Sequence, residues 1–124
     1  MKKVIAILVL ALAFSLNSNA QDQAVKTVSL EQTKGDFTQK HVTISEGSYI
    51  FEIANNHSGV DVGFVLIEKG KDAANPENHI KTAYVTKVVG EGQTEKSNVT
   101  KLAKGEYTYF CPLNKTPQYT LTVE

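Results

Sequence analysis

The sequence predicts an all-β protein, folded as a single sandwich or Greek-key barrel of short strands. Two observations predict this class. Several short segments alternate apolar and polar residues or are rich in aromatic and β-branched residues, and Gly- or Asn-containing turn signals separate them. After residue 20, no segment of useful length has the 3.6-residue periodicity of a helix. About six to eight strands at this spacing are typical of sandwiches and barrels.

The N-terminus has the organisation of a secretory signal peptide. Lys2 and Lys3 precede an apolar run over residues 4–16, and small polar residues then lead to Ala20. The run is shorter than the ~20 residues that a membrane-spanning helix needs, which favours cleavage over an uncleaved anchor. We therefore expect a signal peptide over residues 1–20. The mature chain would be one periplasmic or secreted domain over 21–124.

Four strands are expected in the first half of the mature chain. Val25–Leu30 and His41–Ser45 alternate with a period of two, and Tyr49–Ala54 is rich in aromatic and β-branched residues. A loop cluster of Asn, His, Ser and Gly follows, over residues 55–59. Phe64–Ile67 is a continuous apolar run, which is typical of a strand buried on both faces.

The second half begins with the polar segment Asp72–His79, which contains a proline and is expected to be a loop or a short helical turn. Ala83–Val89 is expected to add a strand. Tyr107–Cys111 is an aromatic strand that Pro112 stops, and Tyr119–Val123 is the last strand.

Composition and motifs exclude several classes of function. Without residues 1–20 the chain has 11 lysines against 13 acidic residues, a net charge of −2, and it contains no arginine. Because no basic patch stands out, we expect no binding to nucleic acid. The motifs of zinc proteases, serine hydrolases and phosphate loops are absent, and so small a domain offers little cleft. We therefore do not expect an enzyme or a stable membrane insertion of the mature chain.

Cys111 is the only cysteine, so it cannot form an internal disulfide. It could be a buried inert thiol, a bridge to a second chain or a metal ligand. Tyr107, Tyr109 and Cys111 share one face of their strand. Packing in the core is the favoured interpretation of this face, and an apolar docking patch is the alternative.

The segment Gly105–Pro112 resembles the C-terminal end of the cupredoxins, the small blue-copper proteins. The order of predicted elements from Val28 to Val123 extends this resemblance over most of the mature chain. The resemblance implies a cupredoxin-like Greek-key β-sandwich. It also implies a role in copper binding or electron transfer with a periplasmic redox or copper-handling partner. Such a copper site needs two imidazoles and a thiolate, with a weak axial ligand.

The resemblance places Cys111 at the thiolate position, Val62 at the first histidine, Asn114 at the second histidine and Pro117 at the methionine. Shifting the alignment by up to two residues would put residue 60 or 61 at the first histidine position instead. Neither Val62 nor Asn114 is a good copper ligand. Gln118, next to Pro117, could supply an axial oxygen.

Two histidines could replace the missing imidazoles. His57 lies in the loop cluster, and His79 lies in the long connection that follows the apolar strand. Two hypotheses follow. The first is a copper site rearranged around Cys111, with ligands drawn from His57, His79, Gln118 and Asn114. The second is a copper-free cupredoxin-fold module that binds or assists another protein.

Overall fold

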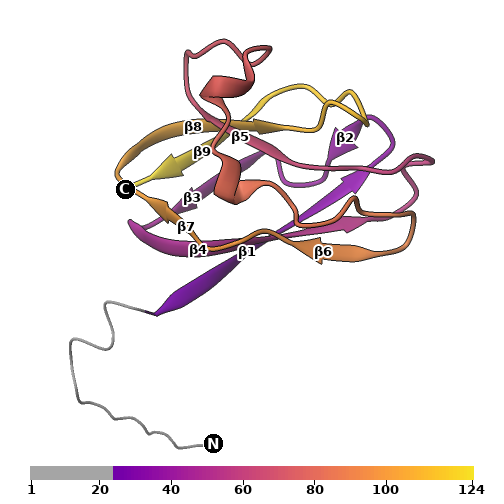
Figure 1. Cartoon of the computed structure of the whole chain (residues 1–124), viewed down its shortest axis with the longest axis horizontal. Helices are drawn as coiled ribbons and strands as arrows, with labels where there is room; N and C mark the ends of the chain where they lie inside the picture. Colours follow the sequence, from indigo (N-terminus) through magenta and orange to yellow (C-terminus); the bar gives the residue numbers. More distant parts are fainter. Residues whose placement is uncertain (1–23) are drawn as a thin grey trace, which may run out of the picture.

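The protein is a sandwich of two β-sheets over residues 24–124, the part of the chain that the computed structural model describes (Figure 1). The expected signal peptide, residues 1–20, lies outside the described residues. Within residues 24–124, no helix is long and apolar enough to cross a membrane.

The first sheet is organised around two long parallel strands. Its strands are β1 (Val25–Thr33), β2 (Asp36–Phe37), β4 (Gly47–Asn55), β6 (Thr94–Lys96) and β7 (Thr100–Leu102). β1 and β4 run side by side from the pair Val25↔Ser48 to the pair Gln32↔Asn55. β6 and β7 pair with opposite ends of β4, and β2 folds back on the end of β1. Both long strands therefore end at the same end of the sandwich.

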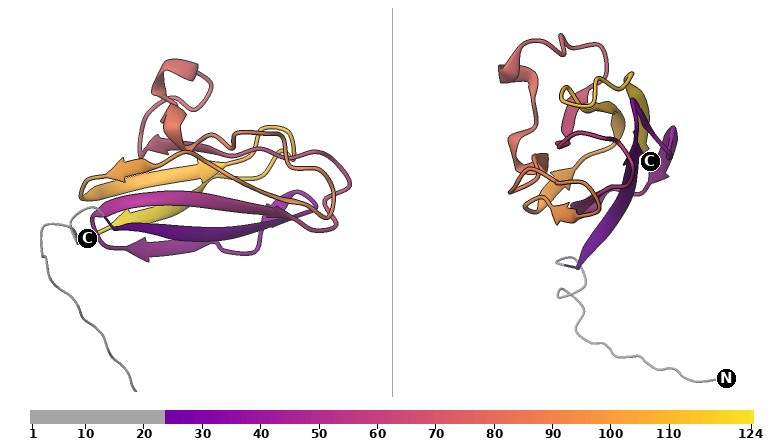
Figure 2. Two further views of the ribbon diagram at one scale, coloured as in Figure 1. Left: turned by 60° about the horizontal axis from the view of Figure 1, so that its bottom comes forward. Right: turned by 90° about the vertical axis from the view of Figure 1, so that its right-hand side faces the viewer.

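The second sheet has the order β3-β9-β8-β5. Its strands are β3 (His41–Ile44), β5 (Val65–Glu68), β8 (Gly105–Phe110) and β9 (Tyr119–Val123). A long connection leaves β5 and forms two 3-10 turns. The first, η2 (Pro76–Asn78), stands off the sandwich (Figure 2), whereas the second, η3 (Lys81–Ala83), packs against it and buries Ala83 in the core. β5 begins, and β8 ends, at the same end where β1 and β4 end.

The core lies between the two sheets. Successive side chains of a strand point to opposite faces, so Tyr49, Phe51 and Ile53 of β4 are buried while the residues between them are only half-buried. Phe37 of β2 is fully buried and meets three further rings edge to face. Those rings are Phe64, Tyr109 and Tyr119. This aromatic cluster fills the part of the core that β8 covers.

The predicted strand over Ala83–Val89 is wrong. Ala83 ends the turn η3, and only single bridges follow, Val85↔Ser97 and Val62↔Val89. Val88 is 55% exposed, because the segment crosses the edge of the sandwich and lies along no strand. The β-branched residues of this segment favour a strand, but no neighbouring strand pairs with it over more than one residue.

The other predicted strands are confirmed, with some ends shifted by one to three residues. The expected turn over Asp72–His79 is also confirmed, as η2. Three short strands were not predicted: β2, β6 and β7. Each has only two or three residues, which is too short for the alternating pattern that predicts a strand.

Candidate functional site

Cys111 directly follows β8 and is fully buried at the end of the sandwich where β1 and β4 also end. Two backbone N–H groups donate hydrogen bonds to its sulfur. They belong to Gly63 in the β4–β5 connection and Asn114 in the β8–β9 loop, each at 3.3 Å. The thiol is therefore enclosed by two loops that lie far apart in the sequence.

The β8–β9 loop is held in a tight turn. The backbone N–H of Cys111 donates to Oγ1 of Thr116 at 2.9 Å, and the backbone N–H of Thr116 donates to the carbonyl of Cys111 at 3.1 Å. Lys115 takes the left-handed conformation, with φ of 56°, which turns the chain back toward β9. These contacts fix Asn114 beneath the loop, where only 7% of it is exposed.

Each polar atom of the Asn114 amide already has a protein partner. Its Nδ2 donates to the carbonyl of Thr33 at 2.7 Å and to Oε1 of Gln32 at 3.2 Å. Its Oδ1 accepts from the N–H of Gly35 at 2.8 Å. The amide oxygen is thus bound to the β1–β2 turn, and the side chain links that turn to the β8–β9 loop.

Val62 comes directly before Gly63 and is fully buried. Its backbone exchanges two hydrogen bonds with Val89, at 3.0 and 2.9 Å. The side chain is an isopropyl group without a lone pair, so it cannot bind a metal. The position before the sulfur-bound glycine is therefore apolar.

The two candidate histidines are directed elsewhere. The side chain of His57 is 93% exposed, with Nδ1 4.0 Å from a carboxylate oxygen of Glu91. The ring nitrogens of His79 bond to the hydroxyl of Tyr84 at 2.7 Å and to the carbonyl of Ala73 at 2.8 Å. Both nitrogens of His79 are thus engaged within the long connection.

Gln118 is exposed, and its Oε1 accepts a hydrogen bond from the hydroxyl of Thr108 at 3.3 Å. Thr108 alternates along β8 with Tyr107 and Tyr109, the residues that share a strand face with Cys111. Among residues 24–124, no three His, Cys, Asp or Glu side chains come together as a group that could hold a metal ion. Of the candidate residues, only Asn114 contacts the thiol, and it does so through its backbone.

Gln32 is a site residue that sequence reasoning missed. It is fully buried, and its Nε2 donates to the carbonyl of Gly63 at 2.7 Å. The sequence does contain a sign of it, because Val28, Leu30 and Gln32 occupy successive inward positions of β1. A polar residue in the inward row indicates a buried hydrogen-bonding role.

Tyrosine hydroxyls and one ion pair lie beside this end of the core. The Lys40 ammonium, 2.5 Å from Asp36, holds the pKa of that carboxyl below its ordinary value, and the hydroxyl of Tyr119 bonds to the same carboxyl. The bond to Asp36 raises the pKa of Tyr119. Burial raises the pKa of Tyr109 to about 12, and its hydroxyl donates to the carbonyl of Gln39. Both phenols therefore stay protonated at neutral pH.

The surface near Cys111 has two hollows, with exposed Leu113 on the border of both. One, of about 400 Å³, is lined by Lys34, Gly35, Ser58, Val60, Leu113, Asn114 and Lys115. The other, of about 320 Å³, is lined by Gly63, Phe64, Val65, His79, Tyr84, Val85, Pro112 and Leu113. Leu113 is 52% exposed and Val60 is 45% exposed. The residues that line the first hollow, at this end of the sandwich, are called the loop-end surface below.

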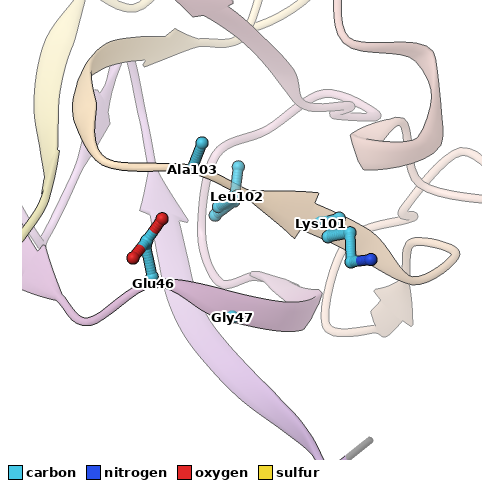
Figure 3. Close-up of a pocket in the computed structure, with 5 residues that line it drawn as sticks. All are labelled: Glu46, Gly47, Lys101, Leu102 and Ala103. Atoms are coloured by element: carbon cyan, nitrogen blue, oxygen red, sulfur yellow. The ribbon is translucent and has the colours of Figure 1, made fainter. Parts of the chain in front are cut away.

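A third hollow, also of about 400 Å³, lies at the opposite end, where β4 begins and β7 ends (Figure 3). Backbone and the side chains of Leu102 and Ala103 form much of its wall. The Glu46 carboxylate lies beside them, and the Lys101 amine is directed away from Glu46. This hollow lies at the opposite end of the sandwich from Cys111, so the loop-end surface is the stronger candidate site.

A two-sheet sandwich with a buried cysteine directly after its penultimate strand is the arrangement that the resemblance to the cupredoxins implied. Residues 5–123 match the cupredoxin-like domain family, and the chain belongs to that family. The predicted family and fold are thus confirmed.

Solved structures with this fold include three auracyanins. Auracyanin B is 22% identical, with 80% of this chain and 88% of that chain covered and a TM-score of 0.63. Auracyanin A, a "blue" copper protein from Chloroflexus aurantiacus, is 17% identical, with 82% and 100% covered and a TM-score of 0.65. The auracyanin from Roseiflexus castenholzii is 18% identical, with 79% and 96% covered and a TM-score of 0.63. No curated protein matches this sequence.

The residues around Cys111 do not fit the copper centre of the blue-copper proteins. That centre needs two imidazoles beside the thiolate. Here the residue before the sulfur-bound glycine is Val62, and the amide of Asn114 is bound to backbone and to Gln32. The fold is that of the family, whereas the donor set around the sulfur is different.

Proposed function

We propose that the mature chain is a copper-free cupredoxin-fold module that binds another protein outside the cytoplasm, in the periplasm or after secretion. The observation that carries the proposal is that neither of the two residues at the histidine positions beside the thiol has a side-chain atom free to bind copper. Val62 has no donor atom, and Asn114 uses its amide within the protein. The proposal includes no catalytic step.

The competing function is copper binding or electron transfer with a ligand set of Cys111, His57, His79, Gln118 and Asn114. The membership of the family and the retained thiol favour it. It would require His79 to give up at least one of two ring hydrogen bonds, and His57 to turn inward from solvent. The copper-free module needs neither change.

The loop-end surface is the place where we expect the partner to bind. It combines two exposed apolar side chains, Val60 and Leu113, with Lys34 and Lys115, the only charged residues that line the first hollow. Apolar contacts flanked by lysines are complementary to a partner surface that carries apolar side chains beside acidic ones. The partner is therefore expected to be a protein with such a surface.

Copper titration of the mature chain, residues 21–124, tests the copper-free assignment. We expect no intense thiolate-to-copper absorption band at one equivalent of Cu(II), and no retained copper after desalting. The positive control is the variant Val62→His/Asn114→His/Pro117→Met, which restores the donor types of the family around Cys111 and should acquire the band. A band in the unmodified chain that Cys111→Ser abolishes would overturn the assignment. His57→Ala and His79→Ala would then identify the imidazoles.

Site-specific crosslinking tests the docking surface. A photoreactive residue at position 60 or 113 should form a crosslink to a protein in the native envelope, and Lys34→Glu/Lys115→Glu should reduce its yield about tenfold. Position 25 is the matched control, because Val25 is also 45% exposed but lies at the far end of β1. Equal yields at positions 25 and 60 would contradict the proposal.

A further inference from the structure

A closed ring of hydrogen bonds joins three chain segments around Cys111. The sulfur accepts from the N–H groups of Gly63 and Asn114. Gln32 donates to the carbonyl of Gly63 at 2.7 Å, and the amide of Asn114 donates to the oxygen of Gln32 at 3.2 Å. The ring therefore passes through the end of β1, the β4–β5 connection and the β8–β9 loop.

The two amides are buried, and each of their polar atoms has a hydrogen-bond partner. Gln32 is 0% exposed and Asn114 is 7% exposed. Two further bonds complete the partners of the Asn114 amide, one to the carbonyl of Thr33 at the end of β1 and one from the N–H of Gly35 in the β1–β2 turn. A buried amide destabilises a fold unless it is hydrogen-bonded, and a fully bonded buried network specifies one arrangement of the groups it joins.

We propose that Gln32 and Asn114 form an amide lock, which holds together the loops around Cys111 where the metal of a blue-copper protein would otherwise join them. Both are positioning residues. Leu113 lies between Cys111 and Asn114 in the chain, so the lock also fixes the most exposed apolar residue of the loop-end surface. The lock goes beyond the proposed function, and it rests on these contacts whether or not a partner binds.

The rate at which Cys111 reacts with an aromatic disulfide reagent, under native conditions, tests the lock. Cys111 is fully buried, so in the unmodified chain it reacts only after local or global opening. Asn114→Ala removes the amide of Asn114 from the lock. Gln32→Met removes the amide of Gln32 with little change of side-chain volume. Both variants should react about tenfold faster or more, because broken buried hydrogen bonds favour local opening of the loops.

The matched control is Ser97→Ala. Ser97 is also buried and polar, and its hydroxyl accepts from the N–H of Phe51 and donates to the carbonyl of Asn98, away from the lock. This variant should be destabilised without local exposure of Cys111. Its thiol reaction should therefore speed up only in proportion to the shift in its global unfolding equilibrium, measured by urea denaturation.

Two outcomes decide the matter. If the lock variants react faster than their unfolding equilibria predict, while Ser97→Ala does not, the lock is supported. If the thiol reaction rates of all three variants are those that their global unfolding equilibria predict, the lock is refuted. Should Asn114→Ala fail to fold, Gln32→Met decides by itself, because it leaves the bonds of Asn114 to Thr33 and Gly35 in place.

Discussion

Replacing Phe37 with alanine is expected to lower the free energy of unfolding by about 3–5 kcal/mol. The ring is fully buried and lies 5.0 Å from Tyr109 and 6.2 Å from both Phe64 and Tyr119, measured between centroids. Removing it leaves a cavity that rigid strands on both sides cannot close. The expected loss is a large part of the roughly 5–15 kcal/mol by which domains of this size are stable.

Urea denaturation of Phe37→Ala, followed by far-ultraviolet circular dichroism, measures this loss. Val88→Ala is the control, since Val88 is 55% exposed and its replacement should change the free energy of unfolding by less than about 0.5 kcal/mol. A loss below about 1 kcal/mol for Phe37→Ala would mean that the aromatic cluster is not packed as the structure has it.

Replacing Asn55 with alanine is expected to lower the free energy of unfolding by about 3 kcal/mol, since each lost buried bond destabilises by about 1–3 kcal/mol and the losses are not additive. Asn55 ends β4 and is fully buried. Its Nδ2 donates to the carbonyls of Val60 and Val89 at 2.8 and 2.9 Å, and its Oδ1 accepts from the hydroxyl of Ser58. Alanine leaves these partners without the side chain that joins them.

The same urea titration measures the effect of Asn55→Ala, and amide hydrogen exchange measures its location. Exchange should increase most over residues 56–63, because Asn55 ties this connection to Val89. Asn98→Ala is the control, since Asn98 is exposed and should have little effect. Unchanged exchange over residues 56–63 would show that the Asn55 amide does not organise the connection.

Strands with a strong local pattern could be predicted from the sequence. β4 and β9 combine alternation with aromatic and β-branched residues, and both were expected close to their true ends. Ala83–Val89 has similar residues but forms only single bridges, because no strand lies alongside it. β6 is polar and becomes a strand only through its pairing with β4. Pattern predicts which segments can be strands, whereas pairing decides which of them are.

The surroundings of Cys111 show the same division. The resemblance to the cupredoxins placed Val62, Cys111 and Asn114 at ligand positions, and the structure brings the Asn114 N–H and the glycine after Val62 to the sulfur. By itself, the sequence therefore determined the fold class, and it determined that the two histidine positions hold residues that are poor copper ligands. Only the tertiary structure decided that the amide of Asn114 meets Gln32, 82 residues earlier in the chain. Alternation within a strand depends on near neighbours, but contacts between loops depend on how the two sheets close, which no local pattern contains.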